Sequence, residues 1–189
     1  MEGNFYEKKS NVDHYINFTP SHDGTLLVDL LVKNLAEGDS VIELGMGPGK
    51  DFSLLSNYFQ VTGSDYSKLF LEIYREKHEN ADLMHLDART LETERKFDAI
   101  FSNKALIHFS SEELQLSFNR QHQLLNDNGL ILHSFWYGER TSVFNDLTLV
   151  EHNEKDLSDM LENLFDILDI KQHAKMSEND SIYVLARKK

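Results

Sequence analysis

The chain has 189 residues, of which 32 are Asp or Glu and 19 are Lys or Arg, and it has no cysteine; this length predicts a single domain over residues 1–189. The lack of cysteine excludes disulfide frameworks, zinc ribbons and thiol nucleophiles, and we expect no metal site. The net charge of −13 disfavours a nucleic-acid partner, because it repels phosphate backbones. With neither a signal-peptide pattern nor about 20 consecutive apolar residues, the sequence predicts a cytoplasmic protein without a membrane partner.

Short apolar runs alternate with helical patterns through most of the chain. Leucines at helical spacing predict a helix over Leu26–Leu35, and the mostly apolar run Ser40–Leu44, which stops at glycines, predicts a buried parallel strand. Similar runs predict strands at Phe59–Gly63, Asp82–Leu86, Phe97–Phe101 and Gly129–Phe135, with helices at Ser67–Lys77 and Ser110–Leu125. Ser110 or Ser111 can cap the second of these helices, with Glu113 placed for a capping box.

The C-terminal part follows another pattern. A helix is predicted over Glu154–Leu164, followed by two strands, Phe165–His173 and Asp180–Arg187. The connection Met176–Asn179 is too short for a parallel crossover, so these two strands should form an antiparallel hairpin. Strands that alternate with helices form parallel sheets covered on both faces. We therefore expect an α/β fold, with a doubly wound, mostly parallel, seven-stranded sheet whose last strand is antiparallel.

A glycine-rich turn gives the strongest functional signal. Gly45, Gly47 and Gly49 follow the first strand with the spacing G-x-G-x-G, and glycines there allow a ligand to approach the backbone. The dinucleotide fingerprint G-x-G-x-x-G places its third glycine one residue later. Glu43, just before the turn, would repel a pyrophosphate but attract an ammonium group. Alternatively, the turn is only a structural connection between a strand and a helix.

Acidic residues stand at the ends of the next two predicted strands. Asp65 can accept hydrogen bonds from both hydroxyls of a ribose, or it merely begins the following helix. Asp87 can accept from an exocyclic amine such as that of adenine, or it only caps a turn. Because parallel strands end at the same edge of the sheet, Glu43, Asp65 and Asp87 should line one edge.

With these residues, the chain resembles the class I S-adenosylmethionine-dependent methyltransferases of the single-domain, small-molecule type. The resemblance runs from about Asn11 to the C-terminus. It rests on five ordered segments: Val41–Gly49, Gly63–Ser67, Leu86–Ala88, Phe97–Asn103 and Leu124–Leu132. It implies a Rossmann-like methyltransferase fold, in which the seventh strand lies antiparallel beside the fifth. Two positions depart from the family pattern: Asn128 replaces a glycine, and Ser102–Ala105 lacks the tetrad of enzymes that methylate amide or nucleobase amines.

The resemblance also implies a role for each matching residue in binding S-adenosylmethionine. The methionyl end would lie at Glu43, Gly45, Met46 and Gly47, the ribose at Asp65, the adenine at Tyr66, Asp87 and Ala88, and the sulfonium above Ser102 and Asn103. In this family the N-terminal segment, here residues 1–24, often folds over the cofactor as a lid, and residues 25–189 would form the core.

The acceptor side is less well marked. His108, past the fourth strand, is a candidate general base, because imidazole titrates near neutral pH; alternatively it is a packing residue. Candidate substrate residues are Tyr15 in the N-terminal segment and Trp136, Tyr137 and Arg140 after the fifth strand. The aromatic residues can equally belong to the core, and Arg140 can equally pair at the surface.

We therefore expect an enzyme that transfers a methyl group from S-adenosylmethionine to a small molecule. The alternative is a non-catalytic subunit that binds the cofactor and stabilises a partner protein. A nicotinamide dehydrogenase fits less well, because the glycine spacing is too short. The accepting atom and the oligomeric state stay open at this point.

Overall fold

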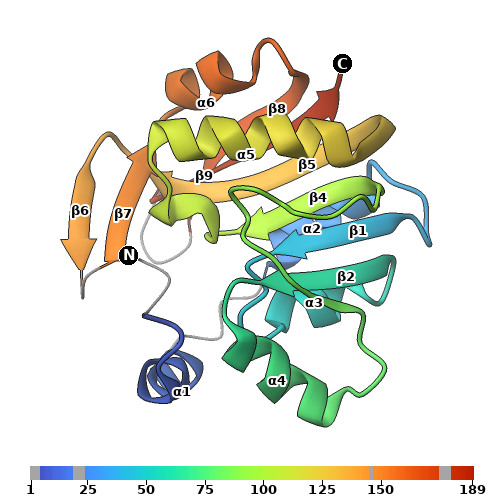
Figure 1. Cartoon of the computed structure of the whole chain (residues 1–189). Coiled ribbons are helices and arrows are strands. Elements are labelled where there is room, and N and C mark those ends of the chain that lie inside the picture. The colour runs from blue at the N-terminus through green and yellow to red at the C-terminus, as the bar shows by residue number, and fades with distance from the viewer. Residues whose placement is uncertain (1–4, 19–23, 145–146, 175–179) are drawn as a thin grey trace.

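The computed structural model describes residues 5–18, 24–144, 147–174 and 180–189, and its centre is a twisted sheet with helices on both faces (Figure 1). The parallel part contains, in spatial order, β3 (Leu83–His85), β2 (Gln60–Asp65), β1 (Ser40–Leu44), β4 (Phe97–Asn103) and β5 (Leu125–Tyr137). Next to β5 lies β9 (Ser181–Lys188), which is antiparallel to β5 and to the edge strand β8 (Phe165–His173). This order confirms the expected mostly parallel sheet with an antiparallel last strand. The predicted connection Met176–Asn179 lies outside the described residues.

A two-stranded hairpin extends the sheet beyond the prediction. Strands β6 (Thr141–Phe144) and β7 (Leu147–His152) pair antiparallel, and β7 also pairs with Trp136 and Tyr137 at the end of β5. The described residues therefore form nine strands rather than seven. The prediction missed β6 because its residues Thr141–Val143 are exposed and form no apolar run.

Helices cover both faces of the sheet (Figure 1). They are α2 (Thr25–Val32) and α3 (Lys50–Leu55) on one face, α5 (Ser111–Leu124), α6 (Glu154–Leu161) and the short 3₁₀ helix η2 (Leu106–His108) on the other, with α4 (Lys68–Lys77) after β2 and α1 (Lys9–Phe18) near the N-terminus. Helix α2 ends at Val32, three residues before the predicted end at Leu35.

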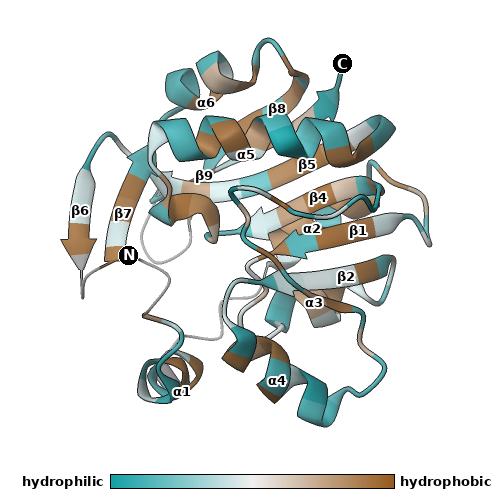
Figure 2. Cartoon of the chain, viewed as in Figure 1, coloured by the Kyte–Doolittle hydropathy of each residue, from teal (hydrophilic) through white to brown (hydrophobic). Residues whose placement is uncertain are grey.

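The strands are buried on both faces, which explains their nearly continuous apolar runs. Along β5, Ile131 packs in the cluster under α5 and α6, whereas Leu130 and Leu132 pack in the cluster under α2 and α3. This alternation follows from the two-residue period of a strand. Figure 2 shows the result as hydrophobic colouring along the central strands, with hydrophilic colouring on the outer parts of the helices.

The start of α5 resolves the choice between two caps. Ser110 is the N-cap: its hydroxyl accepts from the Glu113 N–H at 3.3 Å, and the Glu113 carboxylate accepts from the Ser110 N–H at 2.9 Å. The two bonds form the expected capping box. They also fix the residue at which the helix begins.

Candidate active site

A cavity of about 170 Å³ lies at the carboxyl ends of β1, β2 and β4. Several segments that are far apart in the sequence meet there because parallel strands end at the same edge (Figure 1). Of the residues predicted for the site, those lining the cavity are Tyr15, Gly45, Gly47, Asp65, Tyr66, Asp87, Ala88, Asn103 and His108. Glu43, Met46, Ser102, Trp136, Tyr137 and Arg140 are not among its described lining residues.

The glycine turn presents backbone to the cavity. Gly45 and Gly47 have φ angles of +68° and +50°, which other residues rarely adopt. A Cβ on Gly45 would lie 2.4 Å from the Cβ of Ala105, so the close approach of these segments requires glycine. The Met46 side chain between them is buried and packs with Phe52 away from the cavity. A ligand at this turn would therefore contact main-chain atoms.

Asp65 is held by two backbone N–H groups. Its Oδ2 accepts from Gly47 at 2.8 Å and its Oδ1 from Ser67 at 2.8 Å. Burial raises the pKa of Asp65 above its ordinary value, and the two N–H groups oppose that rise. The carboxylate thus joins the end of β2 to the glycine turn after β1 and faces the cavity in a fixed position.

Glu43 lies next to the cavity with an unpaired oxygen. Its side chain is 3 % exposed, and its Oε2 has no hydrogen-bond partner. Burial, followed by the charges of Asp51 and Asp65, raises the pKa of Glu43 well above its ordinary value. A buried acceptor without a donor is unfavourable, so this position suits a cationic group that donates hydrogen bonds.

Sequence reasoning missed the role of Asp51 in the first turn of α3. Its Oδ2 accepts from the Asn103 side-chain amide at 2.8 Å, and its Oδ1 accepts from the Gly24 N–H at 2.8 Å. Asp51 therefore connects the end of β4 to the residue that precedes α2. The available signal was an acidic residue two positions after the last glycine of the turn.

Asn103 and Ser102 face in different directions. Asn103 lines the cavity, and its Oδ1 accepts from the Ser134 hydroxyl at 2.7 Å. Ser102 is fully buried, and its hydroxyl lies 2.8 Å from His133 Nδ1 in the core. Successive residues of β4 point to opposite faces, so only one of this pair reaches the cavity.

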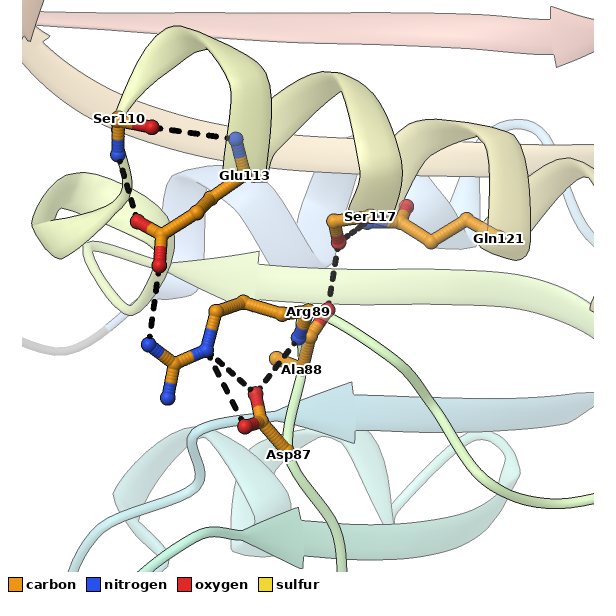
Figure 3. A network of polar contacts seen from close by, with 7 residues as sticks. All are labelled: Asp87, Ala88, Arg89, Ser110, Glu113, Ser117 and Gln121. Carbon is orange, nitrogen blue, oxygen red and sulfur yellow. Dashed lines mark hydrogen bonds and ion pairs between the residues drawn. The ribbon is translucent and has the colours of Figure 1, made fainter.

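Arg89 is a second residue that sequence reasoning missed. It lines the cavity and pairs with Asp87 at 2.9 Å and with Glu113 at 3.1 Å (Figure 3). The hydrogen bond to Asp87 is the main cause that raises the pKa of Arg89 above its ordinary value. The predicted adenine acceptor is thus paired with a cation within its own loop.

His108 lines the cavity and contacts the β6–β7 hairpin. Its Nδ1 is 2.7 Å from the carbonyl oxygen of Thr148 on β7. A carbonyl only accepts, so Nδ1 must carry the proton, and Nε2 of the neutral ring holds the lone pair. The unpredicted hairpin therefore sets the tautomer of the candidate base, and its residue Leu147 also lines the cavity.

Two tyrosines of the N-terminal segment, Tyr6 and Tyr15, line the cavity. The rings of Tyr6 and Tyr15 are 5.6 Å apart, and each lies 5.7 Å from the ring of Phe70 on α4. The Ser67 hydroxyl donates to the Tyr6 carbonyl at 2.6 Å, so this segment is attached next to Asp65.

The substrate candidates Trp136 and Tyr137, which end β5, and Arg140, which follows it, do not line this cavity. The Trp136 ring lies 3.9 Å from Lys104 Nζ, and Tyr137 is partly exposed. Arg140 pairs with Glu151 on β7 at 3.1 Å. The end of β5 pairs with β7, so Trp136 and Tyr137 lie beside the hairpin.

Residues 41–129, which include the glycine turn, Asp65, Asp87 and His108, match the protein family described as a methyltransferase domain. Residues 41–129 therefore form a methyltransferase domain. A comparison with curated proteins finds no match to this methyltransferase. Within the described ranges, every helix lacks the length or the apolar character that a bilayer-spanning segment requires.

Solved structures share the fold of this methyltransferase. One is the 1,6-didemethyltoxoflavin-N1-methyltransferase of Burkholderia thailandensis, with 19 % identity, a TM-score of 0.79, and coverage of 93 % of this chain and 82 % of that chain. An S-adenosylmethionine-dependent methyltransferase of Clostridium acetobutylicum has 16 % identity and a TM-score of 0.77, covering 95 % and 98 %. The N-methyltransferase NodS of Bradyrhizobium japonicum has 12 % identity and a TM-score of 0.76, covering 97 % and 98 %. At these identities the similarity establishes the shared Rossmann-like methyltransferase fold.

Proposed function

We propose that this methyltransferase transfers a methyl group from S-adenosylmethionine to a small-molecule acceptor. The observation that carries the proposal is that the glycine turn, Asp65, Asp87 and His108 meet in one cavity. These groups come from four segments after different strands, and together they provide backbone contacts, two carboxylates and a base.

S-adenosylmethionine is the cofactor, and the residues of the site fit its parts. The unpaired Oε2 of Glu43, with Asp51 nearby, suits the ammonium group of the methionyl end. The fixed carboxylate of Asp65 suits the ribose hydroxyls, and Asp87 and Ala88 suit the adenine. The Burkholderia and Bradyrhizobium enzymes with this fold were solved with S-adenosylhomocysteine.

The cofactor supplies an electrophilic methyl group on a sulfonium, so the protein has to orient the acceptor and exclude water. Tyr6 and Tyr15 of the N-terminal segment, which we propose acts as a lid, close the cavity on one side. His108 Nε2 would take the proton that an acceptor hydroxyl or amine loses when its lone pair bonds to the methyl group. Asn103 lines the cavity beside the glycine turn and would lie near the transferred group.

A small acceptor is supported by the size and lining of the cavity. Leu147 and Phe109 form apolar walls beside His108, and Tyr15 adds an aromatic one. The net charge of −13 disfavours a nucleic acid. The Burkholderia enzyme with this fold was crystallised with the small molecule 1,6-didemethyltoxoflavin.

The test is binding of S-adenosylhomocysteine to the wild type and to Asp65→Ala, measured by calorimetry. We expect the substitution to weaken binding by roughly 10- to 150-fold, because a hydrogen bond to a charged group contributes about 1.5–3 kcal/mol. Asp98→Asn is the matched control: Asp98 accepts hydrogen bonds from Ser40 and Asn126 at the opposite edge of the sheet. Its binding should equal that of the wild type.

Methyl transfer to a panel of hydroxyl, amine and thiol metabolites tests the reaction itself. Transfer to one of them supports an enzyme. Tight cofactor binding without any transfer, together with copurification of a stoichiometric partner, would instead support a non-catalytic subunit. Equal binding by the wild type and Asp65→Ala would contradict the assignment of the cofactor site.

A further inference from the structure

The loop after β3, residues 87–89, is held to α5 by two separate sets of hydrogen bonds (Figure 3). In the first set, Arg89 Nε donates to Asp87 Oδ1 at 2.9 Å, and Arg89 Nη1 donates to Glu113 Oε1 at 3.1 Å. In the second set, the Ser117 hydroxyl donates to the Ala88 carbonyl at 2.6 Å. All three residues of the loop line the cavity. The position of α5 therefore determines where these three residues lie in the cavity wall.

The second set continues into the core as a chain of hydrogen bonds, in which each side chain donates to the next one toward the loop. Gln121 donates to the Ser117 hydroxyl at 2.9 Å, and His133 Nε2 lies 2.7 Å from Gln121 Oε1. His133 must therefore donate from Nε2, which leaves its Nδ1 to accept from the Ser102 hydroxyl at 2.8 Å. Burial lowers the pKa of His133 to about 3, so the ring is neutral. The four side chains of this chain are fully buried: Ser102, His133, Gln121 and Ser117. Each is hydrogen-bonded to the next, and these bonds hold α5 in one position against β4 and β5.

Glu113 links the first set to the start of the helix. Its Oε2 accepts from the Ser110 N–H in the capping box, while its Oε1 accepts from Arg89. Its side-chain direction is thus set by the helix cap. Arg89 in turn lies between two carboxylates, with its guanidinium 5.6 Å from the centre of the Phe109 ring. The position of Arg89 follows from that of the helix.

The two carboxylate oxygens of Asp87 differ in the number of hydrogen bonds that they accept. Oδ1 accepts from the Arg89 N–H and from Arg89 Nε, both at 2.9 Å. Oδ2 accepts only a long bond of 3.2 Å from the same Nε. A carboxylate oxygen can accept two hydrogen bonds, so Oδ2 is the oxygen with capacity for a ligand donor.

We propose that Arg89 and Glu113 are positioning residues that make the site selective for adenine, because they fix the Asp87 carboxylate so that Oδ2 accepts from the exocyclic amino group of the purine. This proposal rests on the proposed function, since it requires an adenosyl cofactor in the cavity. A purine with a carbonyl oxygen in place of the amino group would put two acceptors face to face. A carboxylate clamped by Arg89 cannot turn away from that oxygen, whereas an unclamped one can.

The test compares S-adenosylhomocysteine with S-inosylhomocysteine, which has that carbonyl oxygen, by calorimetry on the full chain. The wild type should bind the adenosyl compound more tightly, and the ratio of the two dissociation constants measures the selectivity. In Arg89→Met we expect this ratio to fall about tenfold, because the adenine bond weakens and the repulsion of the inosine oxygen is relieved. Glu113→Gln, which keeps a side chain able to complete the cap, should lower the ratio by a smaller factor.

Glu112→Gln is the matched control on the same turn of α5. Glu112 accepts from the Ser110 hydroxyl and is not paired with Arg89. The ratio of the two dissociation constants in Glu112→Gln should therefore equal that of the wild type. In an Asp87→Ala background, Arg89→Met should produce no further change in the ratio. Thermal melting of each variant checks folding, and if Arg89→Met does not fold, Glu113→Gln decides.

A merely structural role for Arg89 predicts equal losses of affinity for both compounds and an unchanged ratio, which would overturn this proposal while leaving the cofactor assignment intact. A wild type that binds both compounds equally would overturn it too. Failure of the wild type to bind S-adenosylhomocysteine would instead contradict the proposed function from which it starts.

Discussion

The carboxylates at the carboxyl edge of the sheet differ in their partners. Asp65 is satisfied by two backbone N–H groups, Asp87 is paired with Arg89, and Glu43 is buried with an oxygen that has no donor. A buried oxygen without a donor is unfavourable, and among these three carboxylates only Glu43 has one. The pKa of Glu43 is raised, so its carboxyl group should keep its proton to a higher pH than an exposed glutamate does. A cationic ligand beside it should favour the charged form.

The stability of the folded chain should depend on pH through Glu43. Because the pKa of Glu43 is raised in the folded chain, the folded state keeps this proton over a pH range in which the unfolded chain has lost it. Its contribution to stability is present below the ordinary glutamate pKa and is lost as the pH rises toward the raised value. In Glu43→Gln, which does not titrate, the melting temperature should exceed that of the wild type increasingly as the pH rises from 4 to 8. Parallel melting curves across that range would contradict the prediction, and Glu112→Gln, an exposed substitution, serves as the control.

The candidate base His108 should contribute to the rate of methyl transfer and not to cofactor binding. His108→Gln should lower kcat for a hydroxyl or amine acceptor by roughly 10²- to 10⁴-fold, the usual contribution of general base catalysis. The dissociation constant for S-adenosylhomocysteine should change less than about twofold, since no cofactor role is assigned to this ring. His122→Gln, on α5 against Phe165, is the control and should keep the wild-type kcat. An unchanged kcat in His108→Gln would show that the ring is only a packing residue.

Residues that act through partners distant in sequence were the hardest to predict. Asp65 and Asp87, which line the cavity, could be predicted because each stands at or just after the carboxyl end of a strand. Asp51 and Arg89 were missed because their partners, Asn103 and Glu113, are 52 and 24 positions away. Their roles depend on how β4 and α5 pack, which no local spacing contains.

At the level of elements, the cap of α5 connects stability to the site. Ser110→Ala removes the hydroxyl that accepts from Glu113, and loss of an N-cap costs about 1 kcal/mol. For a chain of this size, we expect the melting temperature to fall by about 2–4 °C. Ser111→Ala, one residue later and outside the cap, should change the melting temperature less. Equal decreases in the two variants would contradict the assignment of Ser110 as the cap.

Element prediction succeeded where one signal dominated and failed where signals were weak. The buried strands were found because both of their faces are apolar, and the β8–β9 hairpin because its connection is too short for a crossover. The β6–β7 hairpin was missed because Thr141–Val143 are exposed and show no apolar pattern. The available signal was the pair Asn145 and Asp146 between two runs rich in β-branched residues, which is typical of a hairpin turn. That omission mattered, since β7 supplies the carbonyl that orients His108.

At the scale of the whole molecule, the topology explains why scattered motifs form one site. Strands β1, β2, β3 and β4 are parallel neighbours, so the loops that follow them emerge at the same edge. Asp65 and Asp87 line the cavity and Glu43 and Asp51 lie close to Asp65 or to each other, while Arg89 pairs only with the Asp87 end of this group. This distribution favours a cationic cofactor over a phosphate-bearing one.

A crystal structure of the wild-type chain with S-adenosylhomocysteine is the most direct test of this account. It should show the ribose hydroxyls within hydrogen-bond distance of Asp65, the ammonium group beside Glu43, and the adenine amino group facing Asp87 Oδ2. Density for the ligand at the other edge of the sheet, or a ribose that contacts no carboxylate, would contradict the account.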